Sequence, residues 1–251
     1  MTKFFTSIVV LFAVPAAVQA QSLNEAKQLI YHERYNSAEA LLHTILKGEP
    51  GSTEAWYTLA RAYMLNNKFK EIKDTLQFAP QEVKESPLLT SVQGHLLLKD
   101  NDSVEAKRNF EMALKDSKRK DPTVLEEIAD AYINTTIGNA HEAIELLQKA
   151  MKKDKNNPAL YVLLGDAYRK LIDGGNAYNA YQQALTKDAN YAVAEYKIGK
   201  IYTSQNNPQA YLPYFEKAVG NDPLYAPALY ELYYYYYYKD INQARDYLAK
   251  Y

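Results

Sequence analysis

The stretch from residue 56 to residue 79 reads WYTLARAYMLNNKFKEIKDTLQFA, and its pattern is the clearest indication of the fold. Apolar and small residues recur three or four positions apart on both sides of Asn66-Asn67-Lys68, beginning with Trp56, Leu59 and Tyr63. This spacing places them on one face of a helix. The polar Asn-Asn-Lys segment is typical of a turn. The stretch therefore predicts two helices that fold back on each other.

The same pattern recurs along the chain with a period of about 34 residues, which is the length of a repeat built from one helix hairpin. Gly94 follows Ala60 by one such period, and Ala113 follows Ala79 by the same interval. Further copies carry small residues at the matching positions of the first helix: Ala129, Gly165 and Gly199. A single helix hairpin cannot bury its apolar face alone, so repeated hairpins stack on their neighbours.

The pattern resembles the tetratricopeptide repeat, whose consensus W-x-x-L-G/A-x-x-Y…A-x-x-x-F…A is nearly complete in residues 56–79 and 161–184. The resemblance extends from about Ser22 to Tyr251. It implies an all-α fold, a right-handed superhelical solenoid of antiparallel helix pairs with six full units and a partial seventh. We place the units at residues 21–52, 53–86, 87–121, 122–157, 158–191, 192–225 and 226–251.

Three local features refine this expectation. Ser22-x-x-Glu25 is a capping box and predicts that the first helix begins there. Gly174-Gly175 is expected in a turn between two helices. The segments Asp116–Asp121 and Thr135–Gly138 make their units slightly longer than the regular period, so we expect these turns to bulge.

The first twenty residues have the composition of a targeting segment. Lys3 is followed by an apolar run from Phe4 to Val14, and small residues precede Gln21. This order is typical of a secretory signal peptide, and the apolar run is too short to span a bilayer. We predict cleavage after Ala20 and export to the periplasm of a Gram-negative bacterium.

The run Tyr233–Tyr238 is the most unusual segment of a chain that contains 24 tyrosines. The repeat register predicts a helix here, with Leu229, Leu232 and Tyr236 on the packing face and with Tyr230, Tyr234 and Tyr237 toward the concave side. Three interpretations stay open. The helix is buried by further chain, it is an aromatic platform for a peptide or glycan, or it is an aggregation-prone end. The apolar last unit favours a chain that continues or that self-associates here.

Composition and motifs argue against catalysis. The net charge is −1, which disfavours nucleic acid as the main partner, and there is no cysteine for a thiol or zinc site. No phosphate-binding loop or nucleophile motif is present. The histidines are predicted to lie on separate helices without a metal-binding spacing, and Glu126-Glu127 is expected on a solvated helix surface. We expect neither catalytic residues nor a metal or cofactor.

The family resemblance also implies where a ligand would bind, because such arrays line a concave groove with the first helix of each pair. One lining residue follows the leading aromatic position and another comes four residues later. Ser91, Glu126 and Val162 hold such positions, and the candidates for the groove are Tyr57, Arg61, His95, Asp130, Asp166, Arg169, Tyr196, Lys200, Tyr230 and Tyr234. A clamp of Lys and Asn for a C-terminal carboxylate is absent from these positions.

These observations predict a non-catalytic scaffold that binds a protein or peptide. Aromatic side chains would anchor the ligand, and Asp130, Asp166, Arg169 and Lys200 would orient it. The alternative is a glycan-binding or nutrient-uptake accessory that uses tyrosine platforms. The lack of a cysteine for lipid anchoring counts against that alternative.

Overall fold

The computed structural model describes residues 16–251, which fold into helices joined by short turns, without strands in this range. Helices pair with their sequence neighbours as antiparallel hairpins, and one short extra helix, α5, stands between the second and third hairpins. The helices are α1 (Ala16–Tyr31), α2 (Tyr35–Gly48), α3 (Thr53–Leu65), α4 (Phe69–Leu76), α5 (Gln81–Lys84), α6 (Pro87–Lys99), α7 (Ser103–Asp116), α8 (Pro122–Asn134), α9 (Ala140–Met151), α10 (Pro158–Lys170), α11 (Gly174–Lys187), α12 (Ala192–Thr203), α13 (Pro208–Asn221), α14 (Ala226–Tyr236) and α15 (Ile241–Lys250). The prediction of an all-α repeat array is confirmed.

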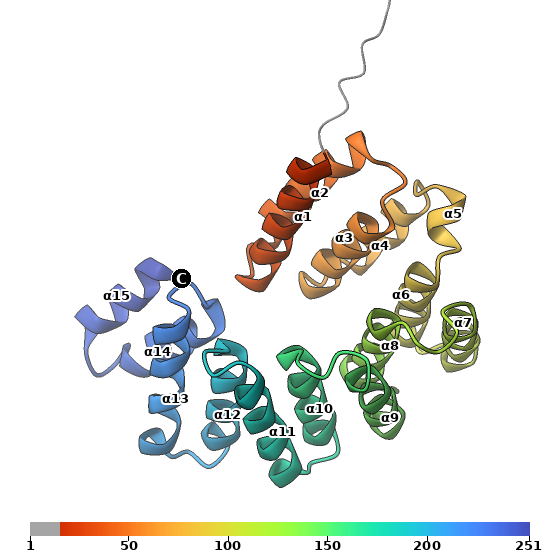
Figure 1. The fold of residues 1–251 in the computed structure, drawn as a ribbon. Coiled ribbons are helices and arrows are strands. Elements are labelled where there is room, and N and C mark those ends of the chain that lie inside the picture. The colour runs from red at the N-terminus through yellow and green to blue at the C-terminus, as the bar shows by residue number, and fades with distance from the viewer. Residues whose placement is uncertain (1–15) are drawn as a thin grey trace, which may run out of the picture.

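The hairpins follow an arc that brings the two ends of the array close together (Figure 1). The first helix of each pair lies on the inner side of the arc, and the second helix lies outside. Near the end of α1, the ring of Tyr31 lies 5.6 Å from that of Tyr225, which precedes α14. The array therefore closes on itself and forms a ring around its inner surface.

Most hairpins turn in the same way. In the turns after α1, α3, α6 and α10 the second of three connecting residues has a positive φ: Glu33, Asn67, Asn101 and Ile172. The third residue then donates its backbone N–H to a carbonyl five residues earlier, as Lys68 does to Tyr63 at 2.9 Å. This is a Schellman cap, which satisfies the last carbonyls of a helix and reverses the chain.

Within a hairpin, a glycine on the first helix faces an aromatic ring on the second. A Cβ atom at Gly165 would lie 2.2 Å from the ring of Tyr181, and one at Gly199 would lie 2.5 Å from the ring of Phe215. Tyr181 and Phe215 are fully buried. These glycines are therefore needed for the close approach of the paired helices.

Two five-residue turns flank α8, where the sequence predicts bulges, and the first of them interrupts the regular stacking. Five residues, Ser117–Asp121, connect α7 to α8, and Lys118 and Arg119 there both have a positive φ. Another five, Thr135–Asn139, connect α8 to α9. Beside the Ser117–Asp121 turn, α6 packs along α8, whereas α7 has little contact with α8. The inner helices α6 and α8 are therefore close together here, and the outer helix α7 lies apart from the next hairpin.

Two local predictions are wrong. The first helix begins at Ala16 and runs through Ser22, so the predicted capping box lies inside α1. Gly174 and Gly175 form the first turn of α11, with Asp173 as the cap, and the left-handed position of that turn belongs to Ile172. Most of the predicted signal peptide, residues 1–15, lies outside the described residues. Across residues 16–251, none of the helices has the length and apolar character that a bilayer span needs.

The tyrosine run is helical through Tyr236, where α14 ends, and Tyr237 and Tyr238 lie in the following turn. Leu229 and Leu232 are fully buried, as the repeat register predicts.

Candidate functional site

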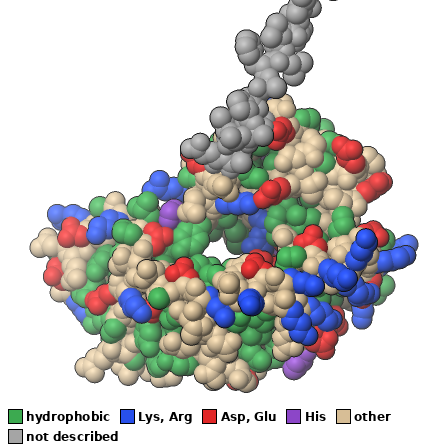
Figure 2. Space-filling view, viewed as in Figure 1, with side chains coloured by type: hydrophobic (Ala, Val, Ile, Leu, Met, Phe, Trp, Pro, Cys, Tyr) green, Lys and Arg blue, Asp and Glu red, His purple; other side chains and the backbone are tan. Residues whose placement is uncertain are grey.

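The inner helices α1, α3, α6, α8, α10, α12 and α14 surround a central hollow, which the space-filling view shows together with charged side chains at its edge (Figure 2). All ten residues predicted to line a groove lie on these helices. They do not share one environment, because some are buried between inner helices and others are exposed.

Four of the predicted residues come together in one network on α3, α6 and α8. Arg61 Nη1 lies 3.1 Å from Asp130 Oδ2 and 3.3 Å from Glu127 Oε2. The hydroxyl of Tyr57 donates to Glu127 Oε2 at 3.1 Å, and His95 Nδ1 lies 2.9 Å from Glu127 Oε1. The side chain of Arg61 reaches past α6 to α8 because the inner helices pack closely here.

Glu127 is the centre of this network, and it is fully buried. Burial alone acts to raise its pKa, but hydrogen bonds and charges from His95, Arg61 and Tyr57 outweigh burial and lower it. Burial likewise acts to lower the pKa of Arg61, whereas Asp130, Tyr57 and Glu127 raise it well above the ordinary value. The carboxylate and the guanidinium are therefore both charged.

The sequence pattern predicts Glu127 on a solvated surface and His95 and Asp130 as groove residues. The structure corrects both interpretations. His95 and Asp130 are buried, as are Ser91 and Val162, because the inner helices pack against each other at these positions. One signal could have identified Glu127: it lies one turn before Asp130, so the two carboxylates share a helix face.

Among the described residues, His95, Glu127 and Asp130 also place donor atoms within 4.8 Å of one another, a spacing at which side chains can hold a metal ion. In this structure the positive charge beside both carboxylates is the guanidinium of Arg61. We therefore describe the cluster as an ion-pair network and call it the Arg61 network.

A small cleft of about 200 Å³ lies beside this network, between α1, α3 and the start of α8. It is lined by Lys27, Ile30, Tyr57, Thr58, Arg61, Thr123 and Glu126. The carboxylate of Glu126 has neither a hydrogen bond nor an ion pair within residues 16–251. Burial, together with the charges of Asp130, Glu127 and Asp154, raises its pKa to about 7, although Arg61 acts in the other direction. We call this the Glu126 cleft.

The next inner helices carry separate ion pairs. Asp166 on α10 accepts from Lys197 Nζ at 2.8 Å and from the hydroxyl of Tyr181 at 2.6 Å. Lys200 on α12 lies 2.7 Å from Glu231 on α14. The side chains of these ion pairs are half-buried, whereas Arg169 on α10 is exposed.

The inner surface ends in aromatic residues where the ring closes. Tyr196 packs against Phe215 and Tyr225, with ring centroids 5.7 Å apart in each case. Beside them, His32 Nε2 from the end of α1 lies 3.0 Å from Asp222 Oδ2. We call the contacts of Tyr31 and His32 with Tyr225 and Asp222 the clasp, because they join the first hairpin to the last two.

Tyr230 and Tyr234 on α14 are exposed, with their rings stacked at 6.5 Å and an interplanar angle of 21°. Tyr237 is exposed as well. The three side chains are thus open to solvent, and their predicted orientation toward the concave side stays a prediction.

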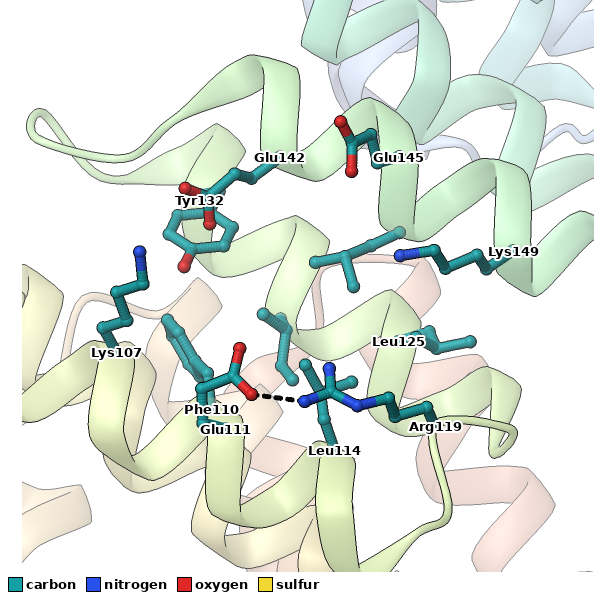
Figure 3. A pocket seen from close by; sticks show the side chains of 12 residues that line it. Lys107, Phe110, Glu111, Leu114, Arg119, Leu125, Tyr132, Glu142, Glu145 and Lys149 are labelled. Carbon is teal, nitrogen blue, oxygen red and sulfur yellow. Dashed lines mark hydrogen bonds and ion pairs between the residues drawn. The ribbon is translucent and has the colours of Figure 1, made fainter.

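A second hollow, of about 470 Å³, lies on the outer side between α7, α8 and α9. Its floor includes Phe110, Leu114 and Leu125, and its rim carries side chains of both charges (Figure 3). Glu111 and Arg119 form an ion pair across it. We call it the outer cleft. It opens where the long Ser117–Asp121 turn separates α7 from α8.

The comparisons with known proteins agree with this architecture. Residues 17–96 match a family model described as a tetratricopeptide repeat. The chain is 24% identical over 161 residues to anaphase-promoting complex subunit 3 of Schizosaccharomyces pombe. This match covers 64% of the chain and 24% of the relative, so the chain spans about a quarter of that protein's length.

Solved structures show the same fold at low sequence identity. A tetratricopeptide repeat protein from Parabacteroides merdae has a TM-score of 0.55 and 15% identity, with 86% of each chain covered. A thermophilic repeat protein from Thermus thermophilus has a TM-score of 0.53 and 17% identity, and the match covers 92% of this chain and 98% of that one. PilW, a type IV pilus biogenesis factor, has a TM-score of 0.52 and 18% identity, with 82% and 94% covered. At these identities the likeness shows the fold alone.

Proposed function

We propose that this chain, which is a tetratricopeptide-repeat protein, is a non-catalytic scaffold that binds an extended protein segment or peptide on the inner surface of its ring. The observation that carries the proposal is the concentration of exposed or half-buried aromatic and charged side chains on the inner helices. Tyr57, Arg169, Tyr196, Tyr230 and Tyr234 belong to this set.

A preformed concave surface favours binding because only the ligand loses conformational entropy, while the protein is already ordered. Aromatic residues supply much of the binding energy of such surfaces, and charged residues fix orientation and register. The inner surface offers both kinds of side chain along one path from α3 to α14. Binding at the inner surface requires no reacting group, which is consistent with a scaffold.

The cellular location is part of the proposal. The composition of residues 1–20 supports export, with cleavage after Ala20 and a periplasmic location. Cleavage there would remove the first five residues of α1, Ala16–Ala20. Mass spectrometry of the protein isolated from its own envelope would test the cleavage site.

Binding can be tested with random 12-residue peptides displayed on phage and selected on the purified protein. Selected peptides are then titrated by fluorescence anisotropy against an inner-surface variant, Arg169→Ala with Tyr230→Ala and Tyr234→Ala. These three side chains are exposed, so the fold is retained. We expect at least a tenfold loss of affinity.

The matched control changes the outer cleft at three exposed positions, Lys107→Ala, Glu145→Ala and Lys149→Ala, and should leave binding unchanged. Peptides that lose affinity only in the control variant would move the site to the outer cleft. Failure to select any peptide would contradict the proposal. The stacked, exposed pair Tyr230 and Tyr234 then favours the second candidate, a glycan platform, which oligosaccharide titration against the same variants would test.

A further inference from the structure

The Glu126 cleft has the size of one side chain. Its volume of about 200 Å³ is smaller than the several hundred cubic ångströms of a typical small-molecule pocket. Ile30 and Tyr57 provide apolar surface on α1 and α3, and Glu126 provides a carboxylate on α8. The cleft lies between three inner helices, and the proposed function places an extended peptide on the surface that these helices line.

The charges around the cleft do not balance. Three carboxylates lie near the single guanidinium of Arg61. Those of Glu127 and Asp130 form ion pairs with it, and that of Glu126 does not. The one lysine of the lining, Lys27, has its Nζ 2.6 Å from Glu54 Oε1. Glu126 is thus a carboxylate in a confined place with no positive partner of its own.

Other titratable groups near Glu126 do not supply that partner. Tyr57 on α3 and Tyr191 before α12 are neutral, since burial raises the pKa of both phenols, and the charge of Glu126 raises the pKa of Tyr191 further. His95 on α6 is directed at Glu127, and Asp154 after α9 adds another negative charge. The surroundings of Glu126 therefore carry an excess of negative charge.

We infer that the Glu126 cleft is a specificity pocket for a basic side chain, Lys or Arg, of the peptide that binds on the inner surface. The cationic end would pair with Glu126, and the methylene stem would pack on Ile30 and Tyr57. This pairing gives a confined carboxylate its missing counter-ion and adds specificity at one position of the peptide. The inference rests on the proposed function, because it names the side chain that the inner surface selects.

The test uses fluorescein-labelled nonapeptide libraries that differ only at the central residue, which is Lys, Arg, norleucine or Glu. Anisotropy titrations at pH 8 measure their binding to the full protein. We expect the Lys and Arg libraries to bind at least tenfold more tightly than the norleucine library, and the Glu library to bind most weakly.

Two variants locate the preference. Glu126→Gln keeps the shape of the side chain and removes its charge, and Ile30→Trp fills the cleft without changing a charge. Both should reduce the preference for Lys over norleucine to less than twofold. Glu145→Gln removes a carboxylate from the outer cleft and is the matched control, which should retain the full preference.

The outcomes separate the two proposals. Libraries that all bind equally well to the unchanged protein would overturn the inference and leave the scaffold function in place. A Lys preference that persists in both Glu126→Gln and Ile30→Trp would overturn it as well, because the basic side chain would then bind elsewhere. If none of the libraries binds the unchanged protein, the proposed function fails with it.

Discussion

The two halves of the inner surface use the same kinds of residue in different ways. In the N-terminal half, Arg61, Glu127 and Asp130 are drawn into one network that spans α3, α6 and α8. In the C-terminal half, Asp166 pairs with Lys197 and Lys200 pairs with Glu231, each between adjacent inner helices and each half-buried. Charged residues at groove positions are thus joined into one network in the first half and form separate ion pairs in the second.

The difference arises from the connections between hairpins. The long turn Ser117–Asp121 lets the outer helix α7 separate from α8, and α6 then packs directly along α8. Farther along the chain each outer helix packs against the following inner helix, and the inner helices stay farther apart. The close packing of α6 on α8 buries His95 and Asp130, whereas Lys200 on α12 is half-buried and Tyr230 on α14 is exposed.

The largest expected effect comes from breaking the Arg61 network. Arg61→Met leaves Glu127 and Asp130 without their cation in a buried place, and we expect the free energy of unfolding to fall by about 4 kcal/mol. Lys200→Met, which breaks a half-buried pair between two side chains that still contact water, should lower it by about 1 kcal/mol. Urea denaturation followed by circular dichroism measures both.

The ratio between these two losses is the informative quantity. Equal losses in the two variants would show that the N-terminal network is as open to water as the C-terminal pairs, and the contrast between the halves would fail. A variant Glu127→Gln offers a second check, because it should lose stability to a similar extent as Arg61→Met.

The fold could be predicted from the sequence because each repeat contains the full spacing of apolar and small residues that a helix hairpin needs. Small residues such as Gly165 and Gly199 mark the close approach of paired helices, and polar turns mark the hairpins. The caps were harder to predict, because the left-handed position in the turn before α11 is taken by Ile172 and not by glycine. Local propensity alone does not place that residue in a left-handed conformation.

The candidate site could be predicted only in part. The repeat register identified Tyr57, Arg61, His95 and Asp130 as residues of the inner helices, and the structure brings these four together. Their burial depends on how closely α6 and α8 approach, which is a property of the turn between α7 and α8. The clasp joins residues 190 positions apart, His32 and Asp222, so the periodicity of single repeats cannot predict it.

Glu126 should make the stability of the protein depend on pH. Its pKa is raised to about 7 in the folded protein, so between pH 4.5 and pH 7 the folded state holds a proton that the unfolded state has lost. The free energy of unfolding therefore falls as the pH rises through this range. Glu126→Gln should stabilise the protein by roughly 2 kcal/mol at pH 8 and by much less at pH 5.

Urea denaturation at the two pH values tests this, with Glu145→Gln as the control that should change little at either pH. A loss of stability in Glu126→Gln at pH 8 would mean that the carboxylate has a favourable partner in the folded state. In that case the cleft would not need a cation from a ligand.

The smallest expected effect on stability belongs to the clasp, where the two halves meet. His32→Ala removes a half-buried pair with Asp222 and should lower the free energy of unfolding by no more than about 1 kcal/mol. The double variant His32→Ala with Tyr31→Ala should change the shape of the ring more than His32→Ala alone, because it also loses the ring contact with Tyr225. Small-angle X-ray scattering should show an increased radius of gyration for the double variant and no change for the exposed control His141→Ala. An unchanged radius in the double variant would show that the stacking of hairpins alone closes the ring, and the difference in curvature between the two halves would then be sufficient to set its shape.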